Sequence, residues 1–204
     1  MEEDRFLGKD GRPCIGVCSD ASCVGGMGTK EADGYHHVRV EWQCVDVATG
    51  EVLMKSDVQP QSTINIGEFM GIVTALKILH RRGDMESPVW CDSQTAIGWV
   101  IGRQTYSQLP MNEFTWEAID AMEEFLGWLK KEDPPNPVLW WSNKRFGPPP
   151  ADYGRKGKEK PHVSVYERAD ALIATFSDHD GKGSVLTTCE KKNCRWPYCL
   201  CVTR

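Results

Sequence analysis

The sequence lacks the features that mark membrane, secreted and repetitive proteins. No apolar run among its 204 residues approaches the roughly 20 residues of a membrane span. Residues 1–5 are mostly acidic and include no hydrophobic segment, so we expect no secretory signal. No internal repeat or low-complexity linker interrupts residues 14–142. These absences indicate an ordinary globular chain, which we expect to be cytoplasmic, monomeric and without a membrane partner.

An excess of positive charge is also missing, because the formal net charge is −5. A protein that coats nucleic acid nonspecifically is usually cationic, so this charge argues against that class. It does not exclude a nuclease, since metal-binding carboxylates add negative charge that the bound cations neutralise. Basic side chains are concentrated between residues 144 and 160, and this segment could contact a phosphate backbone. They are Lys144, Arg145, Arg155, Lys156, Lys158 and Lys160.

The nine cysteines are an odd number and do not suggest a disulfide framework. Five lie in apolar or strand-like stretches and are interpreted as reduced core residues, namely Cys14, Cys18, Cys23, Cys44 and Cys91. The other four have a spacing unlike paired zinc knuckles, so we expect no Zn²⁺ site at Cys189, Cys194, Cys199 and Cys201. We therefore predict a flexible start over 1–13, one domain over 14–174, and a cysteine-containing tail over 175–204.

The hydrophobic pattern predicts three strands, a helix, a strand, two helices, a strand and a final helical segment. Their ranges are strands at 14–22, 36–46 and 51–58, a helix from an Asn65 N-cap to Gly83, a strand at 88–92, a helix capped by Ser93, a helix over 113–131, and a strand at 138–141. A helix between the first and fourth strands implies that these two strands pair in parallel. The expected fold is α/β, a mixed five-stranded sheet with helices on its faces.

Three acids occupy corresponding places in this pattern. Asp20 lies at or near the end of the first strand, Glu68 in the first turn of the first helix, and Asp92 at the end of the fourth strand. Each has an ordinary structural interpretation alone: Asp20 could cap a turn, Glu68 could complete a capping box with Asn65, and Asp92 could precede a helix cap. Together at one sheet edge they would repel one another unless cations lay between them. Such oxygen ligands suit two Mg²⁺ ions, and no Ser–His–Asp or Cys–His arrangement competes with this interpretation.

The chain resembles type 1 ribonuclease H, and in particular a compact bacterial subgroup of it. The resemblance rests on Ser-Asp-Ala-Ser at 19–22, Asn-Ile-Gly-Glu at 65–68 and Cys-Asp-Ser-Gln at 91–94, and it spans residues 14–152. It implies cleavage of the RNA strand of RNA–DNA hybrids, with Asp20, Glu68 and Asp92 holding two Mg²⁺ ions that Mn²⁺ could replace. The resemblance also implies residues that contact the minor groove of the hybrid, where ribose hydroxyls distinguish RNA from DNA. These residues are Ser22, Gly25, Gly26, Gly28, Asn65 and Gln94.

The resemblance implies a fourth carboxylate after the last strand, and two candidates remain. Asp152 is close to that strand and belongs to a run similar to the ending of the compact subgroup. Asp170 lies in Glu-Arg-Ala-Asp, which looks like the commoner family ending, and would bring His162 as an aid to product release. Helix quality favours Asp170, because glycines weaken a helix begun at residue 151. Chain distance favours Asp152, which we prefer because it needs no loop of roughly 20 residues.

Two other functions fit the same pattern. One is a nuclease of this fold acting on another substrate, such as a resolvase or an exonuclease. The other is a noncatalytic nucleic-acid-binding domain, although such a domain has no use for three acids facing phosphates. The sequence therefore predicts a Mg²⁺-dependent ribonuclease H whose partner is an RNA–DNA hybrid.

Overall fold

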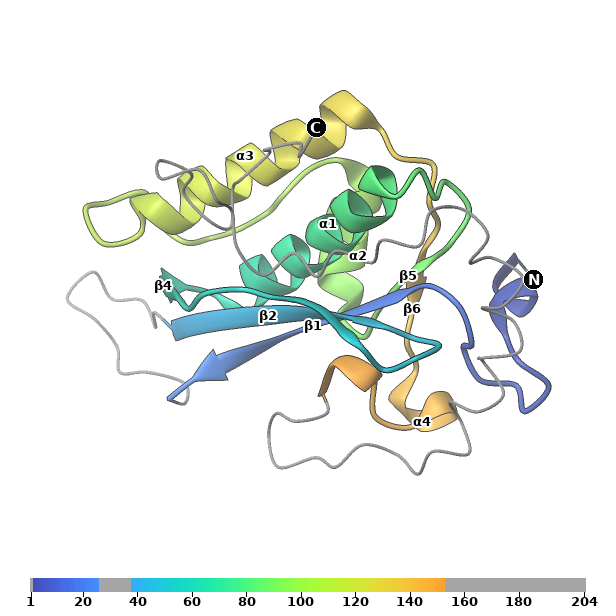
Figure 1. Ribbon diagram of the computed structural model, residues 1–204. Helices are drawn as coiled ribbons and strands as arrows, with labels where there is room; N and C mark the ends of the chain where they lie inside the picture. Colours follow the sequence, from blue (N-terminus) through green and yellow to red (C-terminus); the bar gives the residue numbers. More distant parts are fainter. Residues whose placement is uncertain (1, 26–37, 153–204) are drawn as a thin grey trace, which may run out of the picture.

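The computed structural model describes residues 2–25 and 38–152, and their centre is a mixed sheet (Figure 1). The sheet runs in the order β3-β2-β1-β5-β6, and β4 pairs with the far part of β2. The strands are β1 (Val17–Val24), β2 (Val38–Asp46), β3 (Val52–Lys55), β4 (Gln59–Ser62), β5 (Val89–Cys91) and β6 (Val138–Trp140). The first strands are antiparallel neighbours, whereas β1, β5 and β6 are parallel, as the crossover argument predicted.

The sheet has six strands where five were predicted. The returning strand expected over 51–58 is divided, because β2 is nine residues long and pairs with β3 at one end and β4 at the other. Ser56 lies at the division and exchanges two hydrogen bonds with the backbone of Trp42, one of them through its hydroxyl. The mixed α/β architecture with helices on its faces is otherwise confirmed.

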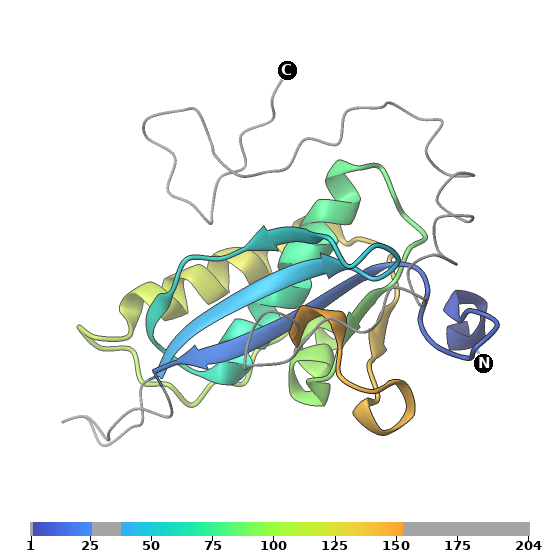
Figure 2. The same ribbon diagram turned by 60° about the horizontal axis from the view of Figure 1, so that its bottom comes forward.

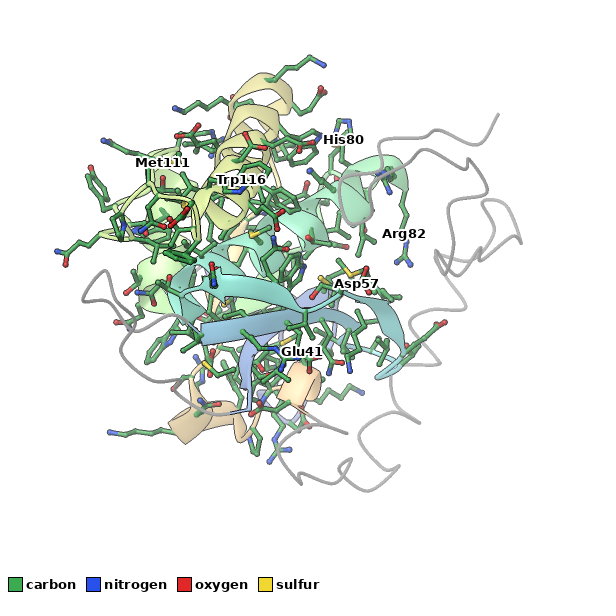
Figure 3. All side chains as sticks on the ribbon, turned by 90° about the vertical axis from the view of Figure 1, so that its left-hand side faces the viewer. Glu41, Asp57, His80, Arg82, Met111 and Trp116 are labelled. Atoms are coloured by element: carbon green, nitrogen blue, oxygen red, sulfur yellow. The ribbon has the colours of Figure 1, made fainter. Side chains whose placement is uncertain are left out.

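Helices cover both faces of the sheet (Figures 1 and 2). The main helices α1 (Ile64–Arg81), α2 (Gln94–Gly102) and α3 (Trp116–Glu132) form one layer, and the short α4 (Asn143–Phe146) and the 3-10 helix η2 (Pro150–Asp152) lie on the other side. Figure 3 shows His80 and Trp116 in the main helical layer, with Glu41 at the sheet, on β2. Within the described ranges, no helix is both long enough and apolar enough to cross a membrane.

The larger core lies between the sheet and α1, which is buried continuously from Ile66 to Leu79. Trp42 is fully buried there, and its indole N–H donates to the Thr74 hydroxyl at 3.2 Å. Gly67 lets α1 approach the sheet closely, because a Cβ at this position would lie 2.1 Å from Cγ1 of the buried Val40. This contact sets the height of α1 above β1 and β2, one residue before Glu68.

A Gly67→Ala substitution is expected to lower the free energy of unfolding by about 1–3 kcal/mol, the usual effect of overpacking a core. Val40 is β-branched and fully buried, so it has little freedom to move aside. Gly98→Ala is the matched control, since Gly98 is an exposed α2 residue with no atom within 4 Å of an added Cβ. That change should stabilise by about 0.5–1 kcal/mol. Urea denaturation of both variants checks the contrast, and equal effects would contradict it.

A second, aromatic core lies on the opposite face. Trp90, Trp141 and Phe146 meet edge to face, with Trp141 and Phe146 centroids 5.5 Å apart. The start of the chain joins this cluster, although a flexible segment was predicted over 1–13. Glu2–Phe6 forms the 3-10 helix η1, Phe6 is 6% exposed within the cluster, and Arg145 donates to the Glu3 carboxylate at 2.9 Å. Phe6 and Leu7 are thus the apolar residues of this segment that dock it on the aromatic cluster.

The ends of α1 differ in part from the prediction. The N-cap is Thr63, whose hydroxyl accepts from the Ile66 backbone N–H, so Asn65 lies inside the first turn. A capping box between Asn65 and Glu68 is therefore excluded, because Asn65 is not the cap. At the other end Gly83 has φ +69° and follows the last helical turn, as expected of a left-handed C-terminal glycine.

Candidate functional site

The site begins where β1 and β5 separate. Their parallel pairing includes only Val17 with Val89 and Cys18 with Trp90. Beyond that point β1 continues along β2 as far as Val24, whereas β5 ends at Cys91. Asp20 was predicted at or near a strand end, but it lies in the middle of β1, just past the last pair with β5. Asp92 directly follows β5, as predicted.

The point where β1 and β5 separate, after Cys18 and Trp90, is called the fork below. Glu68 reaches this fork from α1. One of its carboxylate oxygens accepts from the Cys91 thiol at 3.5 Å, and the backbone of Ala21 also bonds to the carboxylate. Ligand atoms of Glu68, Cys91 and Asp92 all lie within 4.8 Å of one another. Three separate elements, α1, β1 and β5, thus bring side chains to one point.

Burial and the charges of Asp20 and Asp92 disfavour the ionisation of Glu68. Glu68 is 7% exposed, and its pKa is raised well above its ordinary value, first by burial and then by the charges of Asp20 and Asp92. The amide and thiol contacts act in the opposite direction but supply no positive charge. Asp20 is also buried, at 3% exposure, so the cluster concentrates negative charge in a place where water screens it poorly.

This raised pKa predicts that the metal-free protein loses stability as pH rises. The folded state keeps the proton on Glu68 when the unfolded chain has released it near pH 4.5, so folding binds a proton in that window. The stabilisation is complete below pH 4.5 and is lost as pH rises through the folded-state pKa. Urea denaturation in a chelator at stepwise pH measures this slope. Glu68→Gln should flatten it, and an unchanged slope in that variant would contradict the assignment.

Asp152 lies in η2, on the other side of the sheet from α1. It ends η2, is 3% exposed, and η2 contacts both β1 and β2. Gln43, which is paired with Asp20 across β1 and β2, donates its amide to the Ala151 carbonyl at 2.5 Å. The residue next to Asp152 is therefore held beside the strand partner of Asp20. Asp170 and His162 lie outside the described residues, as do the tail cysteines.

The residues expected to contact substrate surround the acids. Asn65 is exposed one helical turn before Glu68, and Gln94 is exposed two residues after Asp92. Ser22 is mostly buried and its hydroxyl bonds to Glu41 at 3.5 Å, while Gly25 has φ +83° just after β1. Gly26 and Gly28 fall outside the described residues. Asn65 and Gln94 are thus open to solvent, and their contact with a substrate stays a prediction.

Sequence reasoning missed three neighbours of Asp92. Asn143 of α4 donates its side-chain amide to the Asp92 carboxylate at 3.1 Å. Trp140 is 47% exposed and its indole N–H donates to the Asp92 backbone carbonyl at 3.3 Å. Cys91 was interpreted only as a core residue, although its place directly before Asp92 could have drawn attention to it. Asn143 and Trp140 carry no local signal, because their contacts span about 50 positions of sequence.

The donor set suits divalent cations. Carboxylate oxygens are the ligands that Mg²⁺ prefers, and a cation between them removes the repulsion that raises the pKa of Glu68. Asp92 is partly exposed, which leaves the cluster open to solvent on one side. Glu68 and Asp92, together with Asp20, are therefore suited to hold a hard ion and leave coordination positions for water or phosphate.

Comparison with known proteins agrees with this geometry. The family described as reverse transcriptase-like matches residues 32–131, which include Glu68 and Asp92 but neither Asp20 nor Asp152. Among solved structures, the chain is similar to the N-terminal RNase H domain of Rv2228c from Mycobacterium tuberculosis, at 16% identity over 64% of this chain and 90% of that one, with a TM-score of 0.41. It is also similar to RNase H1 from Halobacterium salinarum, at 15% identity over 78% and 92%, with a TM-score of 0.37.

A further similar structure is that of LC11-RNase H1 in complex with an RNA/DNA hybrid, at 18% identity over 64% of this chain and 86% of that one, with a TM-score of 0.41. The family match covers the helix and strand that carry two of the acids, and the sheet order supplies the rest of the framework. The chain therefore contains an RNase H-like domain.

Proposed function

We propose that this protein is a Mg²⁺-dependent endoribonuclease that cleaves the RNA strand of RNA–DNA hybrids, leaving 5′-phosphate and 3′-hydroxyl ends. The observation that carries the proposal is the meeting of Asp20, Glu68 and Asp92 at the β1–β5 fork, where two of the charges raise the pKa of the third. A structural role does not explain this meeting, because like charges in a buried place destabilise the fold. A cation-dependent reaction does explain it.

In this proposal, Asp20, Glu68, Asp92 and Asp152 hold the ions. Bound Mg²⁺ pairs supply an activated water and neutralise charge on the departing oxygen. The protein's own contribution is positional. Gln43 holds the Ala151 carbonyl, Asn143 orients Asp92 through its carboxylate, and the Ala21 amide orients Glu68.

Two features support a nucleic-acid duplex as substrate. The N-termini of α1 and α2 both open beside the acids, with caps at Thr63 and Ser93, and helix N-termini favour phosphate. Asn65 and Gln94 offer neutral amides that can donate to and accept from ribose hydroxyls, the groups that distinguish RNA from DNA.

The test is incubation of the full chain with labelled RNA–DNA hybrid, double-stranded RNA and double-stranded DNA, each with Mg²⁺ or with EDTA. Cleavage confined to the RNA strand of the hybrid, and only with Mg²⁺, is the expected result. Cleavage of another substrate would replace the proposal by a nuclease of different specificity. Binding of hybrid without cleavage would replace it by a noncatalytic binding domain.

Asn65→Ala and Gln94→Ala sharpen the test of substrate class. Both residues are exposed, so neither change should alter folding. If they contact the hybrid, the ratio of kcat/KM for hybrid to that for competing duplexes should fall. Glu51→Ala is the matched surface control, since Glu51 is exposed at the β2–β3 turn away from the fork.

A further inference from the structure

Cys91 places a sulfur ligand among the carboxylates of the site. Its Sγ lies 3.5 Å from Oε2 of Glu68, and the ligand atoms of Glu68, Cys91 and Asp92 are mutually within 4.8 Å. The nuclease mechanism proposed above gives this thiol no task, because Mg²⁺ binds oxygen and has little affinity for sulfur. The position therefore calls for an explanation of its own.

The spacing fits a single tetrahedral ion. Zinc binds thiolate at about 2.3 Å and carboxylate at about 2.0 Å, so at a tetrahedral angle the sulfur and oxygen stand about 3.5 Å apart. That is the separation of Cys91 and Glu68. Asp92 supplies a third ligand and is partly exposed, which gives an ion a path from solvent and leaves the fourth position to water.

A second observation also points to a metal-bound sulfur. The Ser93 backbone N–H donates to Sγ of Cys91 at 3.4 Å, at the N-terminus of α2. An amide directed at sulfur stabilises the negative charge that a thiolate ligand carries, and it fixes the side chain toward Glu68. The Ser93 amide thus favours the ligating form, whereas burial and then the charge of Glu68 raise the pKa of the Cys91 thiol, so a bound cation is what would hold the thiolate there.

We propose that Glu68, Cys91 and Asp92 form a site for one thiophilic divalent cation of the Zn²⁺, Co²⁺ and Cd²⁺ class, whose occupation excludes Mg²⁺ from the same two carboxylates. On binding, the S–H bond of Cys91 is replaced by a metal–sulfur bond, and the proton passes to solvent. The site then holds an ion through sulfur and is closed to the hydrolytic reaction. Binding of the ion through sulfur does not depend on any hydrolytic activity, whereas the exclusion of Mg²⁺ and of hydrolysis rests on the proposed function.

Co²⁺ is the probe, because a cobalt–thiolate bond absorbs in the near ultraviolet and Mg²⁺ does not. The cysteines at 189, 194, 199 and 201 could also bind Co²⁺, so the signal is the difference between the full chain and its Cys91→Ser variant. A Cys23→Ser variant is the matched control, since Cys23 is a partly buried cysteine of β1 outside the cluster. Circular dichroism confirms that each variant is folded.

The expected result is a thiolate band that persists in Cys23→Ser and is lost in Cys91→Ser. Asp92→Asn, at a partly exposed position, should weaken Co²⁺ binding at least about 10-fold, the lower end of the effect of even outer-shell partners. Excess Mg²⁺ should diminish the band. Identical spectra for the full chain and Cys91→Ser would overturn the site, and a band indifferent to both Mg²⁺ and Asp92→Asn would overturn the shared carboxylates.

Discussion

Glu68→Gln is expected to reduce hydrolysis of the hybrid by about 1,000-fold or more while making the metal-free protein more stable. The activity falls because a metal ligand is lost, and metal contacts contribute several kcal/mol to the transition state at about 1.4 kcal/mol per tenfold. The stability rises above pH 4.5 because glutamine is neutral in both states, whereas folding of the wild-type chain must either keep a proton on Glu68 or bury its charge beside Asp20 and Asp92. The gain should be about 1–3 kcal/mol, the usual penalty of an uncompensated buried group.

The opposite signs separate a role in chemistry from damage to the fold. Kinetics with Mg²⁺ and urea denaturation in a chelator measure the two effects on the same preparation. Glu51→Gln, at an exposed turn, is the control and should change neither quantity appreciably. A Glu68→Gln variant that lost both activity and stability would show that Glu68 supports the structure rather than a metal.

Asp152→Asn is expected to lower hydrolysis by about 100-fold or more, whereas Asp170→Asn should change it by less than about threefold. Asp152 is buried in η2 against β1 and β2, next to a carbonyl that Gln43 holds. Asparagine has nearly the same shape, and thermal unfolding should confirm that the fold is kept.

The comparison of these two variants decides the fourth ligand. Each is assayed for kcat and KM over a range of Mg²⁺ concentrations, because loss of a ligand should also raise the Mg²⁺ requirement. A large effect of Asp170→Asn with a small effect of Asp152→Asn would reverse the assignment and bring His162 into consideration. Equal large effects would contradict a site with only one further carboxylate.

Much of the fold could be predicted because its signals are local. Ser93 caps α2 as expected, and the helix between the first and fourth strands forces the parallel pairing of β1 with β5. The errors arise where distant partners decide. Thr63 rather than Asn65 caps α1, and β1 continues past Asp20, because β2 offers a partner as far as Val24.

In the candidate site, too, the residues with local signals could be predicted and those defined by long-range contacts could not. Asp20, Glu68 and Asp92 were identified by their places in the element order, and they stay predictions as ligands until tested. Asn143 and Trp140 could not be found, since each meets Asp92 only after β6 and α4 have packed beside β5. The sequence around Cys91 is that of an ordinary buried cysteine, and only the fold shows that its thiol contacts the Glu68 carboxylate.

The contact between η1 and α4 has a consequence for the order in which the chain folds during its synthesis. Glu3 and Arg145 are 142 positions apart, and Phe6 joins an aromatic cluster that includes Trp141 and Phe146. A ribosome releases the N-terminal segment first, so Glu3 cannot pair with Arg145 until α4 emerges. Asp152 follows only a few residues later. A nascent chain therefore exposes the strands of its sheet before Asp152 emerges, and under the proposed function hybrid cleavage should appear only after residue 152 has left the ribosome.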